Sequence, residues 1–568
     1  PRVYVRLDRI PLNASGKVNK RALPDIVSVD VEDNYLPPVT NTELKLVKIW
    51  ESILHRPRIG VQDNFFELGG HSLLAVHMLA EISKTFHVKL SIREIFEGPT
   101  VKALSQVIES RNIEEESIPH AEKQDEYEVS QTQKRIYLMS VANQDEVCWH
   151  MSFAAQMNEA IDMEKLNYAC QELVNRHEIL RTTFHAHGAS ITQKVHENVL
   201  FEVQVIKTED TKLEEEMDKL QSIPFYFEKL FLIRVYVLES ESKNLLFVDM
   251  HHIIADGVSL KNIINELIQV YRGISLEGEE VVQYKDYVAY EKKVRMSQSY
   301  QDGEKFYQKL FKDCKKTAYL IPDYRREAKR YYEGDSITIS FTEQEYENIE
   351  SYINQNELTL FMFLSSTLAI LMKKVTGEGN VVIGTPISGR NHSALLHSIG
   401  AFINTIPLRF QVQEQAQLTE HFAESKKMIL DCFEHQIVSF DDIVKASGYV
   451  GENGRNPLYD VTFIMQNTGV AQMEEADPGV SIYPLKRKTV NSDLLFEAEI
   501  IRNKLCITLE YITELYSKDT VERLIEQYKQ MILDIVCEKS SLIRGLQLQK
   551  EEQDELSLDL TDDFLDLL

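Results

Sequence analysis

The sequence predicts a multidomain protein in which a small all-α bundle precedes a larger, two-lobed α/β unit. The length of 568 residues exceeds a single domain of roughly 100–200 residues. Apolar residues recur at helical spacing over residues 39 to 112, whereas strand and helix patterns mix from residue 127 to about residue 540. The composition, 43% hydrophobic and 27% charged, is that of an ordinary globular protein and excludes global disorder.

Charge, cysteine spacing and hydropathy exclude several classes of protein. A formal net charge of −27 argues against nucleic-acid binding, which usually requires a basic field. The six cysteines lie far apart without a CxxC pair, so we expect reduced core residues rather than disulfides or a thiolate zinc site. No stretch approaches about 18 apolar residues and no leader begins the chain. We therefore expect a soluble, cytoplasmic protein with no membrane segment.

The first residues do not begin with methionine and run directly into a strand-like alternation, which indicates a piece of a longer protein. Residues 11 to 18, Pro-Leu-Asn-Ala-Ser-Gly-Lys-Val, then form a turn-rich loop that presents Lys17. We expect residues 1 to 27 to end a preceding domain and residues 28 to 38 to be a polar linker.

Residues 39 to 112 are expected to form the helical bundle. A first helix begins near Thr42, whose side chain can cap it, and a second and a third helix begin at Ser72 and Thr100. One face of the first helix carries Leu44, Val47, Trp50 and Leu54. The acidic residues 113 to 126 are expected to link this bundle to the larger unit.

The first motif with chemistry spans residues 63 to 74, Asp-Asn-Phe-Phe-Glu-Leu-Gly-Gly-His-Ser-Leu-Leu. Its glycines let the backbone turn tightly, and Ser72 follows at a helix start, where backbone N–H groups and the helix dipole would stabilise an attached phosphodiester. A serine in this place is more often only a helix cap. The complete string resembles the carrier-protein motif of non-ribosomal peptide synthetases, which implies a four-helix carrier bundle. The resemblance implies that a phosphopantetheinyl transferase attaches 4′-phosphopantetheine to Ser72, which then tethers an aminoacyl or peptidyl thioester.

The loop around Lys17, with Arg-Ala-Leu-Pro behind it, resembles the last core motif of an adenylation domain. In that family the lysine binds oxygens of the acyl-adenylate, which suits a flexible ammonium on a glycine-hinged loop. Because the rest of an adenylation domain is absent, we expect Lys17 to be a solvated surface residue here.

A second motif, residues 251 to 259, reads His-His-Ile-Ile-Ala-Asp-Gly-Val-Ser. The preceding strand pattern predicts that His252 points inward and that His251 points to the side of Asp249. After the Asp-Gly turn, Ser259 can cap the next helix. The position alone fits either a cleft histidine or a satisfied core histidine. No third ligand and no HExxH pattern accompany the pair, so no metal is expected.

The HHxxxDG pattern resembles the active-site motif of condensation domains, which share the chloramphenicol acetyltransferase fold. Tyr290 stands where that family often has tryptophan, and Ser439 where proline is usual. The resemblance implies an N-terminal lobe over residues 127 to 298 and a C-terminal lobe over residues 299 to 540. Further motifs follow in the family's order at residues 130–137, 176–184, 284–287, 399–409, 435–436 and 454–458.

Amide formation requires an amine to attack a donor thioester, and His252 is the candidate catalytic residue because imidazole titrates near neutrality. Whether it removes a proton or only orients the amine stays open, and His251 is expected to support the site. By resemblance Asp256 pairs with an arginine, for which Arg390 is the first choice and Arg181 the second. Such a buried pair would fix the backbone that aims His252. Gly257 would allow the phosphopantetheine arm to approach closely.

Three other functions share parts of this pattern. An epimerization domain also has HHxxxDG, but its carrier usually has aspartate where His71 stands, and residues 176 to 184 resemble domains that take L-configured donors. A stand-alone coenzyme-A acyltransferase would not need Ser72. A non-catalytic docking platform would not need His252. The amino acids that are joined stay open, because the adenylation pocket that selects them is absent.

The last segment, residues 541 to 568, ends in eight acids without a base, interspersed with leucines and a phenylalanine. It is expected to be either a linker or a segment that docks on the next synthetase protein. The partners that the resemblance implies are an upstream adenylation domain and a downstream acceptor carrier.

Overall fold

The computed structural model describes residues 35–548, apart from short internal gaps. Lys17, the expected adenylation-domain tail at residues 1 to 27 and the acidic end after residue 548 lie outside the described residues. The gaps are at 55, 71, 87, 89, 112–116, 143–146, 189, 277–280, 315–316, 328–330, 450–453, 467–478, 486–488 and 502–503.

Four helices form the bundle: α1 (Asn41–Leu54), α2 (Ser72–Phe86), α3 (Ile92–Glu97) and α4 (Val101–Glu109). The expected starts of α2 and α4 are confirmed, and Thr100 caps α4. The expected cap of α1 is wrong, because Thr40 rather than Thr42 accepts the backbone N–H of Glu43 (3.1 Å). The Glu43 carboxylate reaches back to the N–H of Thr40, which completes a capping box. Leu44 is also 47% exposed, so it is not part of the core.

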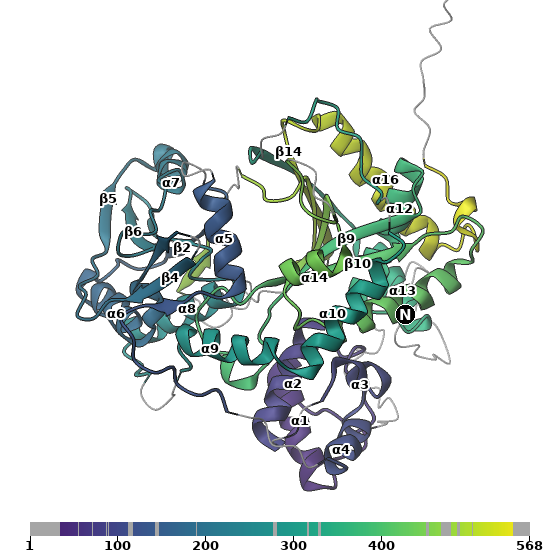
Figure 1. Cartoon of the computed structure of the whole chain (residues 1–568), viewed down its shortest axis with the longest axis horizontal. Coiled ribbons are helices and arrows are strands. Elements are labelled where there is room, and N and C mark those ends of the chain that lie inside the picture. The colour runs from purple at the N-terminus through teal and green to yellow at the C-terminus, as the bar shows by residue number, and fades with distance from the viewer. Residues whose placement is uncertain are drawn as a thin grey trace, which may run out of the picture.

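The N-terminal lobe of the larger unit contains a five-stranded sheet in the order β12-β2-β7-β6-β5 and a small sheet in the order β1-β4-β3. Figure 1 shows this lobe in blue on the left, with the purple bundle below. Its strands are β1 (Tyr127–Glu128), β2 (His150–Met157), β3 (Thr182–His187), β4 (Ser190–Val195), β5 (Gln204–Lys207), β6 (Ile233–Glu239), β7 (Asn244–His251) and β12 (Val480–Ile482). Its helices are α5 (Gln131–Val141), α6 (Met163–Arg176), η3 (Glu178–Arg181), η4 (Asp210–Lys212), α7 (Leu213–Gln221), α8 (Gly257–Tyr271) and α9 (Tyr284–Arg295).

The C-terminal lobe contains a six-stranded sheet in the order β10-β9-β11-β13-β14-β8. Its strands are β8 (Gly334–Ser340), β9 (Asn380–Ile387), β10 (Asn404–Gln411), β11 (Val461–Gln466), β13 (Leu494–Ile501) and β14 (Lys504–Ile512). Its helices are α10 (Gln298–Phe311), α11 (Glu343–Gln355), α12 (Leu360–Thr376), η5 (Ser393–Leu395), α13 (Leu418–Glu434), α14 (Phe440–Ser447), α16 (Lys518–Val536) and η6 (Ile543–Gly545).

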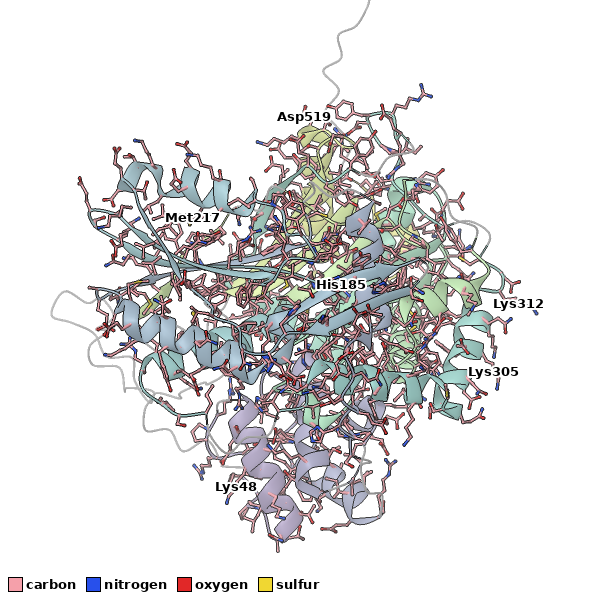
Figure 2. All side chains as sticks on the ribbon, turned by 60° about the vertical axis from the view of Figure 1, so that its left-hand side comes forward. Lys48, His185, Met217, Lys305, Lys312 and Asp519 are labelled. Atoms are coloured by element: carbon pink, nitrogen blue, oxygen red, sulfur yellow. The ribbon has the colours of Figure 1, made fainter. Side chains whose placement is uncertain are left out.

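Each lobe and the bundle has its own apolar core. Figure 2 shows the described side chains on all three parts of the molecule. Strand β12 is an exception to the expected lobe boundary. It comes from the C-terminal part of the chain but pairs antiparallel with β2 in the N-terminal lobe. The two lobes are therefore joined by a shared sheet.

Two expectations about composition can be compared with the structure. All six cysteines are free, and three of them are buried, but Cys537 is exposed and so is not a core residue. Within the described part of the chain, no single helix has the length and apolar character to cross a bilayer. Helices α11 and α12 reach that length only as a pair, which is bent by 98°.

Candidate active site

The HHxxxDG motif occupies the turn between strand β7 and helix α8. Strand β7 ends at His251, which pairs across the ladder with His150 of β2. The next residue, His252, donates its backbone N–H to the carbonyl of Trp149 (2.8 Å). The turn is thereby anchored to Trp149, the residue that precedes β2.

His251 is the more buried of the two histidines, with 4% of its surface exposed. Its Nδ1 accepts the backbone N–H of Ile253 (3.1 Å), and its ring lies edge-on to Phe227. Burial holds the pKa of His251 well below its usual value. The strand pattern predicts that His252 points inward. This prediction assumes that the strand continues to His252, but β7 ends at His251. His251 is a neutral residue that closes the turn.

His252 is only partly buried, and its ring lies beside Trp149 with centroids 6.0 Å apart. Its Nδ1 is shielded from solvent. Burial lowers the pKa of His252, and the nearby Asp256 carboxylate offsets part of that effect. At neutral pH the imidazole is therefore uncharged and keeps a lone pair for a proton.

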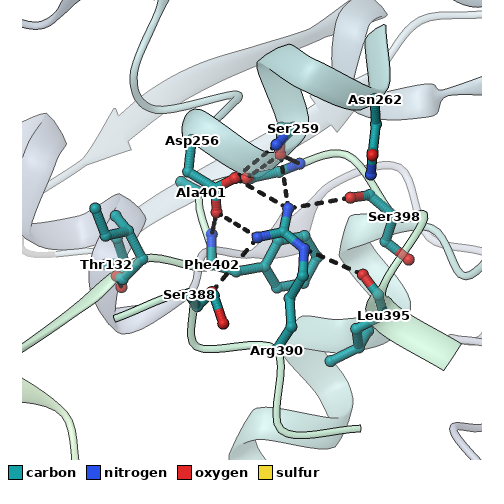
Figure 3. A network of polar contacts seen from close by, with 12 residues as sticks. Thr132, Asp256, Ser259, Asn262, Ser388, Arg390, Leu395, Ser398, Ala401 and Phe402 are labelled. Carbon is teal, nitrogen blue, oxygen red and sulfur yellow. Dashed lines mark hydrogen bonds and ion pairs between the residues drawn. The ribbon is translucent and has the colours of Figure 1, made fainter. Parts of the chain in front are cut away.

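Asp256 and Arg390 form a buried, two-pronged ion pair (Figure 3). The two guanidinium N–H groups lie 2.8 and 3.0 Å from the carboxylate oxygens, and each residue is 2% exposed. The carboxylate also accepts the backbone N–H groups of Ser259 (2.8 Å) and Phe402 (3.1 Å). Because Asp256 comes from the N-terminal lobe and Arg390 follows β9, the pair connects the two lobes at the motif.

The second-choice arginine, Arg181, does not reach the motif. It ends η3 and donates to the backbone carbonyl of Asn175 (3.3 Å). The structure therefore pairs Asp256 with Arg390 rather than with Arg181. Gly257 is the first residue of α8, directly beside the cap.

Ser259 has a larger part in this network than the sequence indicated. Asp256, not Ser259, caps α8, because a side chain three residues before an N–H reaches it best at a helix start. The fully buried Ser259 hydroxyl accepts from Arg390 (2.8 Å) and from the backbone N–H of Gly400 (3.0 Å). The backbone carbonyls of Leu395 and Ser398 accept two more guanidinium N–H groups. Ser398 contributes only a backbone carbonyl to this network, whereas Phe402 contributes its backbone N–H and a ring that lies under the Arg390 guanidinium, 4.4 Å from the ring centroid.

A second buried charged cluster lies on the other side of β7. The carboxylate of Asp249 accepts the Ser152 hydroxyl (3.0 Å) and lies 3.1 Å from His150 and 3.7 Å from Arg234. Ser152 and Arg234 are the cross-strand neighbours of Asp249 on β2 and β6. The guanidinium of Arg234 stacks on Phe225. This cluster stiffens the strand that carries the motif.

Ser72 lies on a different domain, as the first residue of α2. Gly69 adopts a φ of +100°, which favours glycine, and a Cβ on Gly70 would lie 2.3 Å from the ring of Phe65. This tight turn directs the chain into α2, whose first backbone N–H groups have no acceptor within the helix. The donor set and the open helix start fit a phosphodiester on a serine.

Comparisons with known proteins identify two families in this chain. The family described as Condensation domain matches residues 123–557, and the family described as Phosphopantetheine attachment site matches residues 45–108. Surfactin synthase subunit 1 of Bacillus subtilis (strain 168) is 32% identical over 539 residues, which are 94% of this chain and 15% of that protein. Gramicidin S synthase 2 of Brevibacillus brevis is 30% identical over 97% of this chain and 12% of that protein. The chain thus spans less than a quarter of these curated relatives.

Solved structures show the fold. The X-domain from teicoplanin biosynthesis has a TM-score of 0.71 at 19% identity and covers 76% of this chain and 100% of its own. The condensation domain from the Monacolin K polyketide synthase MokA has a TM-score of 0.65 at 18% identity, over 74% of this chain and 99% of its own. The expected combination of an all-α bundle and a two-lobed α/β unit is confirmed.

Proposed function

Because the chain belongs to the condensation-domain family and carries a phosphopantetheine attachment domain, we propose that it joins the donor thioester on its own carrier to the amine of an acceptor aminoacyl thioester. The family pair is that of non-ribosomal peptide synthesis, and amide formation is an acyltransferase reaction. When bound, the 4′-phosphopantetheine supplies the thiol that holds the acyl group as a thioester. Ser72 is the proposed attachment residue and would be modified by a phosphopantetheinyl transferase.

The observation that carries this proposal is the buried Asp256–Arg390 pair behind a partly exposed, neutral histidine. The attacking amine must be uncharged at the start and must lose a proton as the amide forms. His252 can accept that proton or hold the amine in place, because it is uncharged and only partly buried. Asp256 and Arg390 act as positioning residues, and His251 closes the turn. Gly257 is proposed to leave room for the cofactor arm.

The proposed domain limits follow the sequence analysis. Residues 39 to 112 are the carrier, residues 127 to 298 and 299 to 540 are the two lobes, and residues 1 to 27 are an adenylation-domain tail with Lys17. An upstream adenylation domain would load the carrier, and an L-configured donor is proposed from residues 176 to 184.

The test compares wild type with H252A and S72A by intact mass. Each protein is incubated with a phosphopantetheinyl transferase, an aminoacyl-coenzyme A and an acceptor carrier that is already loaded. Wild type should gain the aminoacyl-phosphopantetheine mass and then transfer the acyl group to the acceptor. H252A should load normally but transfer at least about a hundredfold more slowly, as expected when acid–base assistance is lost. S72A should not load.

Two outcomes would replace this proposal. Unchanged transfer by H252A would favour a docking platform. An inverted configuration of the carrier-bound residue, without transfer to the acceptor, would favour an epimerization domain, which shares the HHxxxDG motif.

The acidic end of the chain is proposed to dock on the next synthetase protein. Residues 551 to 568 combine eight acids with leucine and phenylalanine anchors, which suits a basic groove with apolar pockets. A labelled peptide of this segment should bind the N-terminal region of the downstream protein, and binding should weaken with salt because charges are screened over about 8–10 Å. If the peptide does not bind at low salt, the segment is a linker rather than a docking segment.

A further inference from the structure

The carrier contacts the C-terminal lobe through a surface of mixed character. Helix α2 lies against η5, and helix α3 lies against α13. Leu79 of α2 and Phe96 of α3 pack against the apolar core of that lobe. Arg93 of α3 forms ion pairs with two acids of α13, Asp431 and, at 3.5 Å, Glu434. A central apolar contact is therefore flanked by one cation that faces two anions.

The charged groups of this contact are accessible to solvent. The side chains of Arg93, Asp431 and Glu434 are 34%, 30% and 45% exposed. Partly exposed ion pairs are weak and are screened by salt, so they set which partner binds more than how tightly it binds. Phe96 is held in place by Phe66, whose ring stacks on it at 4.5 Å. A contact of this kind suits a carrier that must leave to be reloaded.

The part of the lobe that α2 touches also supports the HHxxxDG turn. The carbonyl of Leu395, the last residue of η5, accepts the Nε–H of Arg390 (3.2 Å), and the carbonyl of Ser398 accepts an Nη2–H (3.2 Å). Arg390 in turn holds Asp256. The carrier is therefore seated on the outer side of the segment that fixes the catalytic turn, rather than on a remote surface.

We propose that η5 together with Asp431 and Glu434, here called the docking face, selects the donor carrier by charge. The face takes this chain's own carrier because Arg93 meets the two acids, and it disfavours a carrier with an acidic side chain at that position. The inference rests on the proposed function, since it takes the seated domain to be the one that holds the donor thioester. Beyond the proposed function, the inference names the side chains that decide whether the carrier docks.

The test measures docking without any chemistry. Hydrogen–deuterium exchange of residues 391 to 399 is followed by mass spectrometry in the full chain. R93E should raise exchange of this segment about fivefold, because one attraction becomes repulsion from two acids. The double variant R93E/D431R should return it toward the wild-type rate, since the pair is restored with its signs exchanged. Added salt should raise exchange in wild type, because it screens the attraction, and lower exchange in R93E, because it screens the repulsion.

The matched control is K48E, which makes the same charge change on α1. Lys48 is exposed on the carrier and lies away from the larger unit in Figure 2, so exchange of residues 391 to 399 should match wild type. Equal exchange in R93E and wild type, or no recovery in the double variant, would overturn the docking face.

The same four proteins are also treated with a phosphopantetheinyl transferase and coenzyme A. A mass gain in all of them shows that each carrier is folded and modified. Absence of that gain in wild type would contradict the proposed function, whatever the exchange result, so the two proposals fail separately.

Discussion

At the scale of single residues, the site depends on a charge pair that water cannot reach. Asp256 and Arg390 are each 2% exposed, and their polar atoms are used by each other, by Ser259 and by backbone groups. A buried pair of this kind contributes little net stability compared with an apolar replacement, but removal of one partner strands the other charge. Asp256 should therefore affect folding and catalysis together.

We predict that D256A lowers the free energy of unfolding by about 3–5 kcal/mol and also slows acyl transfer, because Arg390 is left buried without its carboxylate. Urea unfolding followed by circular dichroism, with the transfer assay, measures both effects. R181A serves as the control, since Arg181 donates to a backbone carbonyl away from the motif, and it should change little. If D256A has wild-type stability but no activity, Asp256 instead contacts the substrate and acts in catalysis.

The charge state of His252 gives a second prediction at this scale. Burial lowers the pKa of His252 below its ordinary value of 6.5, so the neutral form persists as the pH falls. If the neutral ring is required, the acidic limb of the pH profile of kcat/KM should lie below pH 6.5. The limb should be absent from the residual activity of H252A. A limb above pH 6.5 that disappears in H252A would contradict the lowered pKa.

At the scale of elements, helix packing places a carboxyl group where charge is disfavoured. Glu291 of α9 accepts the backbone N–H of Gln131 at the start of α5 (3.2 Å). Burial raises the pKa of Glu291 to about 7, with Asp442 of α14 adding to the rise and Arg295 opposing it. Through Glu291, the folded protein thus gains a bound proton relative to the unfolded chain between about pH 4.5 and 7. The contribution of Glu291 to stability must fall as the pH rises through this window.

We therefore predict that E291Q stabilises the protein at pH 8 by roughly 2–3 kcal/mol and has little effect below pH 4.5. The glutamine oxygen can still accept the N–H of Gln131, so only the charge is lost. Unfolding midpoints of both proteins across this pH range give the difference. E214Q on the exposed face of α7 is the matched control and should show no such pH dependence. A constant difference between E291Q and wild type at every pH would contradict the assignment.

The elements around the site differ in how well the sequence predicts them. Helix α8 follows from its apolar spacing, and Ile263, Ile264 and Leu267 are buried as expected. Its cap was assigned to the wrong residue, because Asp256 and Ser259 are both good capping residues and only the backbone geometry separates them. A four-helix bundle is expected from the resemblance, but the pattern does not locate helix α3, since six residues are too few for a clear period. The family resemblance pointed to Arg390, but the Ser259 hydroxyl and the Phe402 N–H are contacts of the folded chain.

At the scale of the whole molecule, β12 is the feature that sequence patterns could least reveal. Three residues carry little pattern, and their partner strand β2 lies more than 300 residues earlier in the chain. This pairing and the Asp256–Arg390 pair join the two lobes, whereas the carrier has a separate core. The two lobes therefore form one unit, and the carrier is a separate domain that is attached to it by few contacts.

This arrangement predicts two unfolding transitions, and the chain's two tryptophans report them separately. Trp50 is fully buried in the carrier core, while Trp149 lies in the N-terminal lobe beside His252. In W149F the fluorescence should follow carrier unfolding, and in W50F it should follow the larger unit, with different urea midpoints. Each substitution leaves the reporting domain intact, so destabilisation of the silent domain does not move the measured midpoint. The circular dichroism of wild type should show both transitions at these two midpoints. One shared midpoint in all three proteins would contradict this prediction. It would mean that the carrier and the lobes unfold together, although one exposed ion-pair cluster and two apolar side chains are too few contacts to couple them so strongly.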